Sequence, residues 1–211
     1  MTSNRNPKTA RVAVFIDGYN LYHGMHGRWQ RKYLWLDLEA LGRRLIKSSQ
    51  TLTVVRYFTA PVRNDAASLA RQKLYLRALQ TYPKIDVTLG RFQEKQPSCR
   101  ACGATWRTYE EKETDVSIAV ALVEDAVNDL YDVAILISAD SDLCPAIRAV
   151  RRLSPDKRII AVFPPGRRAD ALRRACDGVR HLDEVSLRNS QLPDEVPGPA
   201  GLAYKRPPHW T

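Results

Sequence analysis

The segment 134–143 joins a short apolar run to two carboxylates that follow it directly. Its first four residues, Ala-Ile-Leu-Ile, have the length and the β-branched content of a buried strand. Asp140 and Asp142 come next, and a helical pattern begins behind them. Ligands of open α/β sheets bind at the carboxyl ends of the strands. The segment therefore predicts a buried strand with a functional group at its end.

A second apolar run, residues 11–16, also ends at an acid, Asp17, with Gly18 and Asn20 close behind it. Further strands are predicted at 52–57, 85–92 and 159–163, with 181–185 as a candidate last strand. Helical patterns separate these runs, and the stretch 93–109 has no regular pattern. Alternating strands and helices predict a mostly parallel sheet in a three-layer α/β/α sandwich.

A long helix is predicted over residues 110–130. At 100° per residue, Asp115 projects in the same direction as Leu122 and Ala126, toward the sheet. Four valines should flank this stripe, at Val116, Val120, Val123 and Val127. The polar positions predicted to face solvent are Glu124, Asp125, Asn128 and Asp129. An inward carboxylate at Asp115 is costly unless a cation or a donor offsets it, so we expect it to be a ligand.

The composition favours an anionic partner. Lys and Arg outnumber Asp and Glu by 33 to 23, which gives a net charge of +10, although a basic surface can also lack a partner. No apolar run approaches the roughly 20 residues that span a bilayer. The polar start also lacks the apolar core of a secretory signal. These features predict a cytoplasmic protein without a membrane partner.

One main domain is expected from the length of 211 residues. We place it at residues 11–187. Residues 1–10 are predicted to be a flexible N-terminus. Residues 188–211 are rich in proline without apolar periodicity, which predicts a disordered tail.

Four acids are predicted to share one crevice if the strands 11–16 and 134–137 are neighbours: Asp17, Asp115, Asp140 and Asp142. Crowded carboxylates favour a hard divalent cation, and Mg²⁺ or Mn²⁺ prefers such oxygen ligands. A metal of this kind activates water and stabilises the charge that develops on a phosphodiester. Each acid alone also fits a structural role, because Asp17 suits a turn and the other three suit helix caps.

Three stretches resemble the signatures of the NYN domain, specifically its LabA-like bacterial branch, which is related to the PIN-domain nucleases. They are Phe-Ile-Asp-Gly-Tyr-Asn ending at Asn20, Lys-Glu-Thr-Asp-Val beginning at Lys112, and Ser-Ala-Asp-Ser-Asp-Leu beginning at Ser138. The resemblance implies a PIN-like fold, metal-dependent ribonuclease chemistry and the four aspartates as the acidic cluster. It also implies supporting roles for Asn20 and Ser138 and phosphate contact by Lys112. Ala139 departs from the family's frequent glycine.

Cys99 and Cys102 form a Cys-x-x-Cys pair that is similar to half of a zinc knuckle. No second pair follows in the sequence, so Zn²⁺ would need distant ligands or a second chain. A reduced pair without metal is the alternative.

Aromatic and basic residues alternate between positions 19 and 35. Arg28 and Lys32 there, and Arg148 in a later basic stretch, are predicted to bind substrate phosphates, while the aromatic rings could stack on bases. The alternative is that Trp29, Tyr33 and Trp35 pack against the sheet. Ser141 completes the polar surround of the acids.

The combined prediction is a metal-dependent endoribonuclease that hydrolyses single-stranded or structured RNA with a metal-activated water. A non-catalytic RNA-binding or regulatory module that retains the pocket is the alternative from another class. A hydrolase of small phosphoesters would share the acids but leave the basic excess without a role. A homodimer is compatible with a PIN-like domain.

Overall fold

A computed structural model describes residues 9–63 and 65–210, apart from the side chains of residues 110 and 111. The predicted flexible N-terminus falls almost entirely outside these residues. Six parallel strands form the central sheet in the order β3-β2-β1-β6-β7-β8. These strands are β1 (Ala10–Asp17), β2 (Gln50–Thr59), β3 (Ile85–Leu89), β6 (Val133–Ile137), β7 (Arg158–Phe163) and β8 (Gly178–His181).

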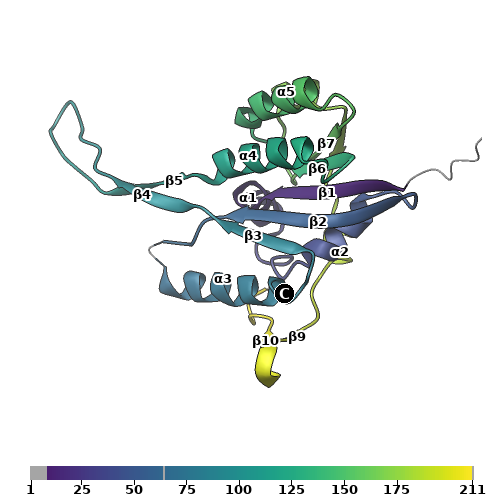
Figure 1. Ribbon diagram of the computed structural model, residues 1–211. Coiled ribbons are helices and arrows are strands. Elements are labelled where there is room, and N and C mark those ends of the chain that lie inside the picture. The colour runs from purple at the N-terminus through teal and green to yellow at the C-terminus, as the bar shows by residue number, and fades with distance from the viewer. Residues whose placement is uncertain (1–8, 64, 211) are drawn as a thin grey trace, which may run out of the picture.

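Helices cover both faces of this sheet (Figure 1). Buried side chains on one face come from α1 (Gly18–Trp29), α2 (Leu38–Leu45), α3 (Ala66–Leu79) and α7 (Glu184–Arg188). Those on the other face come from α4 (Thr114–Val127), α5 (Cys144–Leu153) and α6 (Asp170–Ala175). The predicted three-layer sandwich is confirmed.

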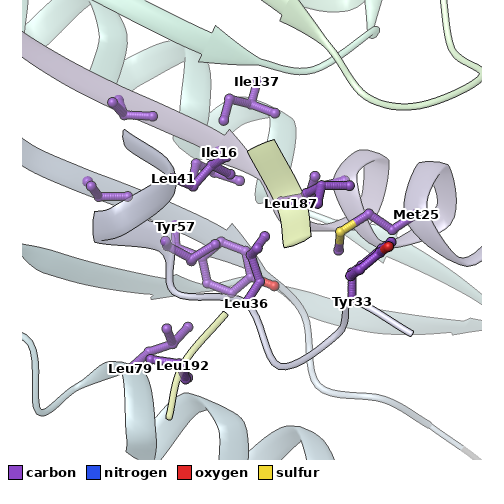
Figure 2. Close-up of a cluster of buried hydrophobic side chains, with 14 of the residues drawn as sticks. Ile16, Met25, Tyr33, Leu36, Leu41, Tyr57, Leu79, Ile137, Leu187 and Leu192 are labelled. Carbon is purple, nitrogen blue, oxygen red and sulfur yellow. The ribbon is translucent and has the colours of Figure 1, made fainter. Parts of the chain in front are cut away.

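Alternating residues of β1 supply both layers. Val12, Val14 and Ile16 join the core under α1 to α3, whereas Ala13 and Phe15 join the core under α4 to α6. Figure 2 shows the first core, in which side chains from the strands, from α1 and α2 and from the C-terminal part of the chain meet. A strand buried on both faces is continuously apolar, which explains why this run is so clear in the sequence.

The stretch that follows β3 differs from the prediction. Instead of one strand over 85–92 and an irregular segment over 93–109, β3 ends at Leu89 and a separate antiparallel hairpin follows, made of β4 (Arg91–Lys95) and β5 (Thr108–Lys112). Figure 1 shows this hairpin projecting away from the sandwich. Strands that pair only with each other need no apolar side facing a core, so they lack the periodicity that would reveal them.

The predicted helix 110–130 begins four residues later than expected, because residues 110–112 belong to β5. Its buried side is also rotated from the predicted one. Leu122 and Ala126 are buried as expected, but Val116, predicted to lie beside that stripe, is 65% exposed. Asp125, predicted to be solvated, is buried against Arg56. A valine-rich stripe on this helix therefore misidentified the face that packs on the sheet.

The C-terminal segment was predicted to be a disordered tail, and the structure contradicts this through residue 210. It forms a small antiparallel ribbon from β9 (Glu195–Pro197) and β10 (Ala203–Lys205), separated by the 3-10 turn η2 (Pro199–Gly201). Trp210 is only 8% exposed, and its ring lies 6.2 Å from that of Trp35 and 5.8 Å from that of Tyr75. Apolar residues that are far apart in this segment pack against the same core. Because they do not recur at a regular spacing, a search for periodicity does not detect them.

The candidate last strand over 181–185 is also corrected. The strand β8 ends at His181, and α7 begins at Glu184. Asp183 caps this helix, since its Oδ1 accepts a hydrogen bond of 2.7 Å from the backbone N–H of Ser186.

Candidate active site at the ends of β1 and β6

The two predicted acidic strands are neighbours in the centre of the sheet. Ile16 of β1 pairs in register with Ile137 of β6. The next residues, Asp17 and Ser138, therefore lie side by side at the carboxyl edge, and the Ser138 hydroxyl donates a 2.8 Å hydrogen bond to Asp17 Oδ2. The strand order places this pair at the crossover point of the doubly wound sheet, where ligands bind.

Asp17 is held by three neutral donors. The backbone N–H of Asn20 donates to Oδ1 at 2.9 Å, and the Asn20 amide donates to Oδ2 at 2.6 Å, beside the Ser138 hydroxyl. Asp17 is 1% exposed and also caps α1. The turn predicted as the alternative is therefore wrong: Asp17 is the N-cap of a helix that begins at Gly18, and it is buried as well.

No Lys or Arg within the described part of the chain forms an ion pair with Asp17. Burial raises the pKa of Asp17, the hydrogen bonds from Asn20 and Ser138 oppose this rise, and the negative charge of Asp140 adds to it. A carboxylate that is buried beside another carboxylate attracts a proton or a metal cation.

Ser138 connects Asp17 to Asp140. Its Oγ accepts a 3.0 Å hydrogen bond from the Asp140 backbone N–H while it donates to Asp17. Asp140 in turn caps the short 3-10 helix η1 (Ser141–Leu143), because its Oδ1 accepts a 2.8 Å bond from the backbone N–H of Asp142. The capping role predicted as the alternative is therefore present, with Asp140 half-buried at the edge of the site.

The other two predicted acids, which we call the rim acids, are exposed. The inward direction predicted for Asp115 is therefore wrong, because the buried side of α4 is rotated from the predicted one. Asp142 and Ser141 are exposed on η1, and Asp115 is exposed in the first turn of α4. Across residues 9–63 and 65–210, no three His, Cys, Asp or Glu side chains are grouped closely enough to hold a metal ion. A single ion shared by all four aspartates thus remains a prediction, whereas Ser138 joins Asp17 to Asp140 through hydrogen bonds.

Arg167 belongs to this site and was not predicted as a member. Its Nη1 donates a 3.2 Å hydrogen bond to Asn20 Oδ1. It follows the Pro164-Pro165-Gly166 turn at the carboxyl end of β7. Ligands of α/β sheets bind at the carboxyl ends of strands, and this rule, which identified Asp17, could also have identified Arg167. The site then has a cation at its edge that is linked to Asp17 through Asn20.

The predicted phosphate-binding residues are dispersed. Arg28 and Lys32 lie at the end of α1 and just beyond it, and Arg148 lies on α5 across the sheet. The Lys32 ammonium already pairs with Glu184 at 3.3 Å. Lys112 is the last residue of β5 and lies next to α4 in the chain. Tyr33 and Trp35 are buried, which confirms the packing interpretation for these two rings.

Cys99 and Cys102 lie in the turn of the β4–β5 hairpin as free thiols. Backbone N–H groups of Cys102 and Ala101 lower the pKa of the Cys99 thiol, and Gly103 closes the turn with a φ of 71°. This is half of a thiolate site. The described residues supply no further ligand beside it, so zinc at this pair remains a prediction that requires a second chain.

A family model described as the NYN domain matches residues 11–183. The curated relative 6-hydroxy-3-succinoylpyridine 3-monooxygenase HspA of Pseudomonas putida (strain DSM 28022 / S16) is 28% identical over 230 residues, which cover 89% of this chain and 72% of the relative. A solved structure of a protein of unknown function, VPA0982 of Vibrio parahaemolyticus RIMD 2210633, matches with a TM-score of 0.61. It is 17% identical, with 89% of this chain and 99% of that chain covered, and supports the fold alone.

No helix in the described ranges is long and apolar enough to cross a bilayer.

Proposed function

Because this chain belongs to the NYN domain family, a PIN-like nuclease superfamily, we propose that it is a metal-dependent ribonuclease of the LabA-like branch. The observation that carries the proposal is the buried Asp17, which has only neutral donors as hydrogen-bond partners and lies beside Asp140. An unbalanced pair of carboxylates at the crossover point of the sheet is suited to a divalent cation.

The residues present fit Mg²⁺ or Mn²⁺. Mg²⁺ needs only one or two protein carboxylates when it retains waters and also contacts substrate phosphates. Asp17 and Asp140 would supply these ligands, and Asp115 and Asp142 would act through retained waters. A bound ion would activate water and stabilise the negative charge that builds up on the scissile phosphate.

The remaining groups prepare this site. Asn20 and Ser138 fix the orientation of the Asp17 carboxylate through three hydrogen bonds. Arg167, which bonds to Asn20, would meet a phosphate of the RNA, together with Lys112. Arg28 and Arg148 would contact more distant phosphates, and the overall charge of +10 would attract the RNA.

The name of one relative describes a different reaction class, oxygenation of a pyridine. We give it less weight than the family model because its identity to this chain is only 28%, whereas the model covers residues 11–183.

The test is cleavage of end-labelled single-stranded and hairpin RNA by the full-length protein with Mn²⁺, Mg²⁺ or EDTA. Asp140→Asn should abolish cleavage, whereas Asp156→Asn, an exposed aspartate elsewhere in the fold, should not. Cleavage that persists in EDTA or in the Asp140 variant would overturn the metal mechanism. Salt-sensitive RNA binding without cleavage would favour the regulatory module instead.

A further inference from the structure

A second candidate site lies on the face of the sheet that carries α1 and α3. It is a cavity of about 370 Å³, which we call the aromatic pocket. Its apolar lining includes Met25, Leu36, Tyr57, Tyr75, Phe92 and Trp210. In Figure 2, Leu36 lies beside Tyr57, whereas Met25 lies farther away, next to Tyr33. The volume is typical of a site for one small molecule and is too small for a folded chain.

The charge of the lining is one-sided. Arg31, Arg63 and Arg71 all contribute to it, and no Asp or Glu does. Neither Arg31 nor Arg63 is ion-paired with a side chain that the structure describes. Arg71 is partly balanced, because it donates at 2.6 Å to Ser68 Oγ, which donates in turn to Asp65. Guanidinium groups above an apolar cavity are suited to an anion whose remainder is hydrophobic.

Two polar side chains that line the pocket already have hydrogen-bond partners. The Gln72 amide accepts a 2.8 Å bond from the Val62 N–H and donates a 2.9 Å bond to the Ala60 carbonyl. The Tyr75 hydroxyl donates to the Leu36 carbonyl at 2.7 Å. These bonds fix the walls in advance, and they occupy both side chains, so neither is a ready partner for the hydroxyl groups of a ligand such as a ribose.

We propose that the aromatic pocket binds a small, planar aromatic carboxylate. The ring would lie among Tyr57, Tyr75 and Trp210, and the carboxylate would accept hydrogen bonds from Arg31 or Arg63 at the mouth. An aromatic acid with one or two rings matches the volume of the cavity. It has no hydroxyl group that would lack a hydrogen-bond partner there.

The pocket adjoins the acidic site without being part of it. Gly18, which lines the pocket, directly follows Asp17 in the chain. A Cβ at Gly18 would lie 2.6 Å from the Phe58 carbonyl oxygen, so only glycine allows this close approach. Occupation of the pocket does not depend on whether Asp17 and Asp140 cleave RNA, so the two proposals can fail separately.

The test uses the full-length protein with 2-naphthoate as the probe and its neutral amide, 2-naphthamide, as the matched control. We expect calorimetry to detect 2-naphthoate binding, with the amide roughly tenfold weaker or more, since it cannot make a charged hydrogen bond to arginine. Tryptophan fluorescence should change on binding, and this change should diminish in Trp210→Phe.

Arg31→Gln combined with Arg63→Gln should weaken 2-naphthoate binding to about the level of the amide. Arg77→Gln, an exposed position on α3 outside the lining, should bind 2-naphthoate as the wild type does. Thermal unfolding checks that each variant folds. Absence of 2-naphthoate binding, equal binding of acid and amide, or binding of adenosine or uridine 5′-monophosphate in preference to 2-naphthoate would each overturn the proposal.

Discussion

Asp17 and Asp125 are both buried, with 1% and 2% of their surfaces exposed, but their partners differ. Arg56 neutralises Asp125 through two parallel bonds, Nε to Oδ2 at 2.6 Å and Nη2 to Oδ1 at 2.8 Å. Asp17 accepts bonds from neutral donors only and lies near a second carboxylate. A buried acid that is paired with a cation has a structural role. A buried acid without a cation carries an uncompensated desolvation cost, which a bound cation would offset.

The largest effect expected from this difference is on activity at Asp17. Asp17→Asn should reduce RNA cleavage roughly 1,000-fold, comparable to the loss of one charge-stabilising group from an active site. Asparagine keeps the size of the side chain and removes a buried charge that no cation offsets, but its NH2 group leaves at least one of the present donors without an acceptor. These effects oppose each other, so thermal stability should not fall strongly. Gel-based cleavage and calorimetric melting measure both quantities. A variant that unfolds but retains the activity of its folded fraction would assign Asp17 a structural role alone.

Asp125→Asn should have the opposite result, with folding weakened and cleavage by the folded protein retained. Loss of the carboxylate leaves Arg56 without its main partner and should cost about 3 kcal/mol, near the low end for a broken buried pair because the Arg56 side chain is 25% exposed. Urea unfolding gives the value. The double replacement Arg56→Met with Asp125→Leu should recover part of the loss, and an unchanged midpoint in Asp125→Asn would show that the pair contributes nothing.

The pH dependence of folding should distinguish paired from unpaired acids. Arg11 lowers the pKa of Asp132 to about 2, so the stability from this pair is complete above the unfolded pKa of about 3.9 and is lost as the pH falls toward 2. The pKa of Asp17 is raised, so its ionisation destabilises the fold as the pH rises above the unfolded value. The two dependences have opposite signs.

Urea titrations in EDTA between pH 2 and 7 measure this difference. Asp132→Asn should remove about 1 kcal/mol of stability at neutral pH, since the pair is partly exposed, and little at pH 2. Wild type should lose stability relative to Asp17→Asn as the pH rises. Parallel curves for the two comparisons would contradict the assignment of Asp17 as uncompensated.

The same contrast explains what the sequence could predict. Asp17, Ser138 and Asp140 follow apolar strands, and parallel strands bring their carboxyl ends to one edge, so periodicity placed these residues at the same edge of the sheet. That β1 and β6 are neighbours, which brings the residues together, came from the structure. That the Asp125 side chain is buried depends on its ion pair with Arg56, which is 69 residues away in the chain. A helix with apolar residues on more than one side does not reveal which side is buried.

The aromatic pocket was not predictable for a related reason. Trp210, Phe92 and Arg63 come from the C-terminal segment, the projecting hairpin and the loop after β2. The first segment was predicted to be disordered, and Phe92 was assigned to the end of a strand over 85–92 rather than to a hairpin. Sites at strand ends can be predicted from local sequence patterns. A pocket whose walls come from distant segments can be found only in the tertiary structure.

The smallest effects on stability are expected at the rim acids. Asp115 and Asp142 are exposed, so replacement of either by asparagine should change the unfolding free energy by no more than about 0.5 kcal/mol. If they act through waters on the proposed metal, the Mn²⁺ concentration for half-maximal cleavage should rise about tenfold in each variant. Asp156→Asn serves again as the matched control. An unchanged Mn²⁺ requirement in both rim variants would restrict the metal ligands to Asp17 and Asp140, the two acids that Ser138 joins.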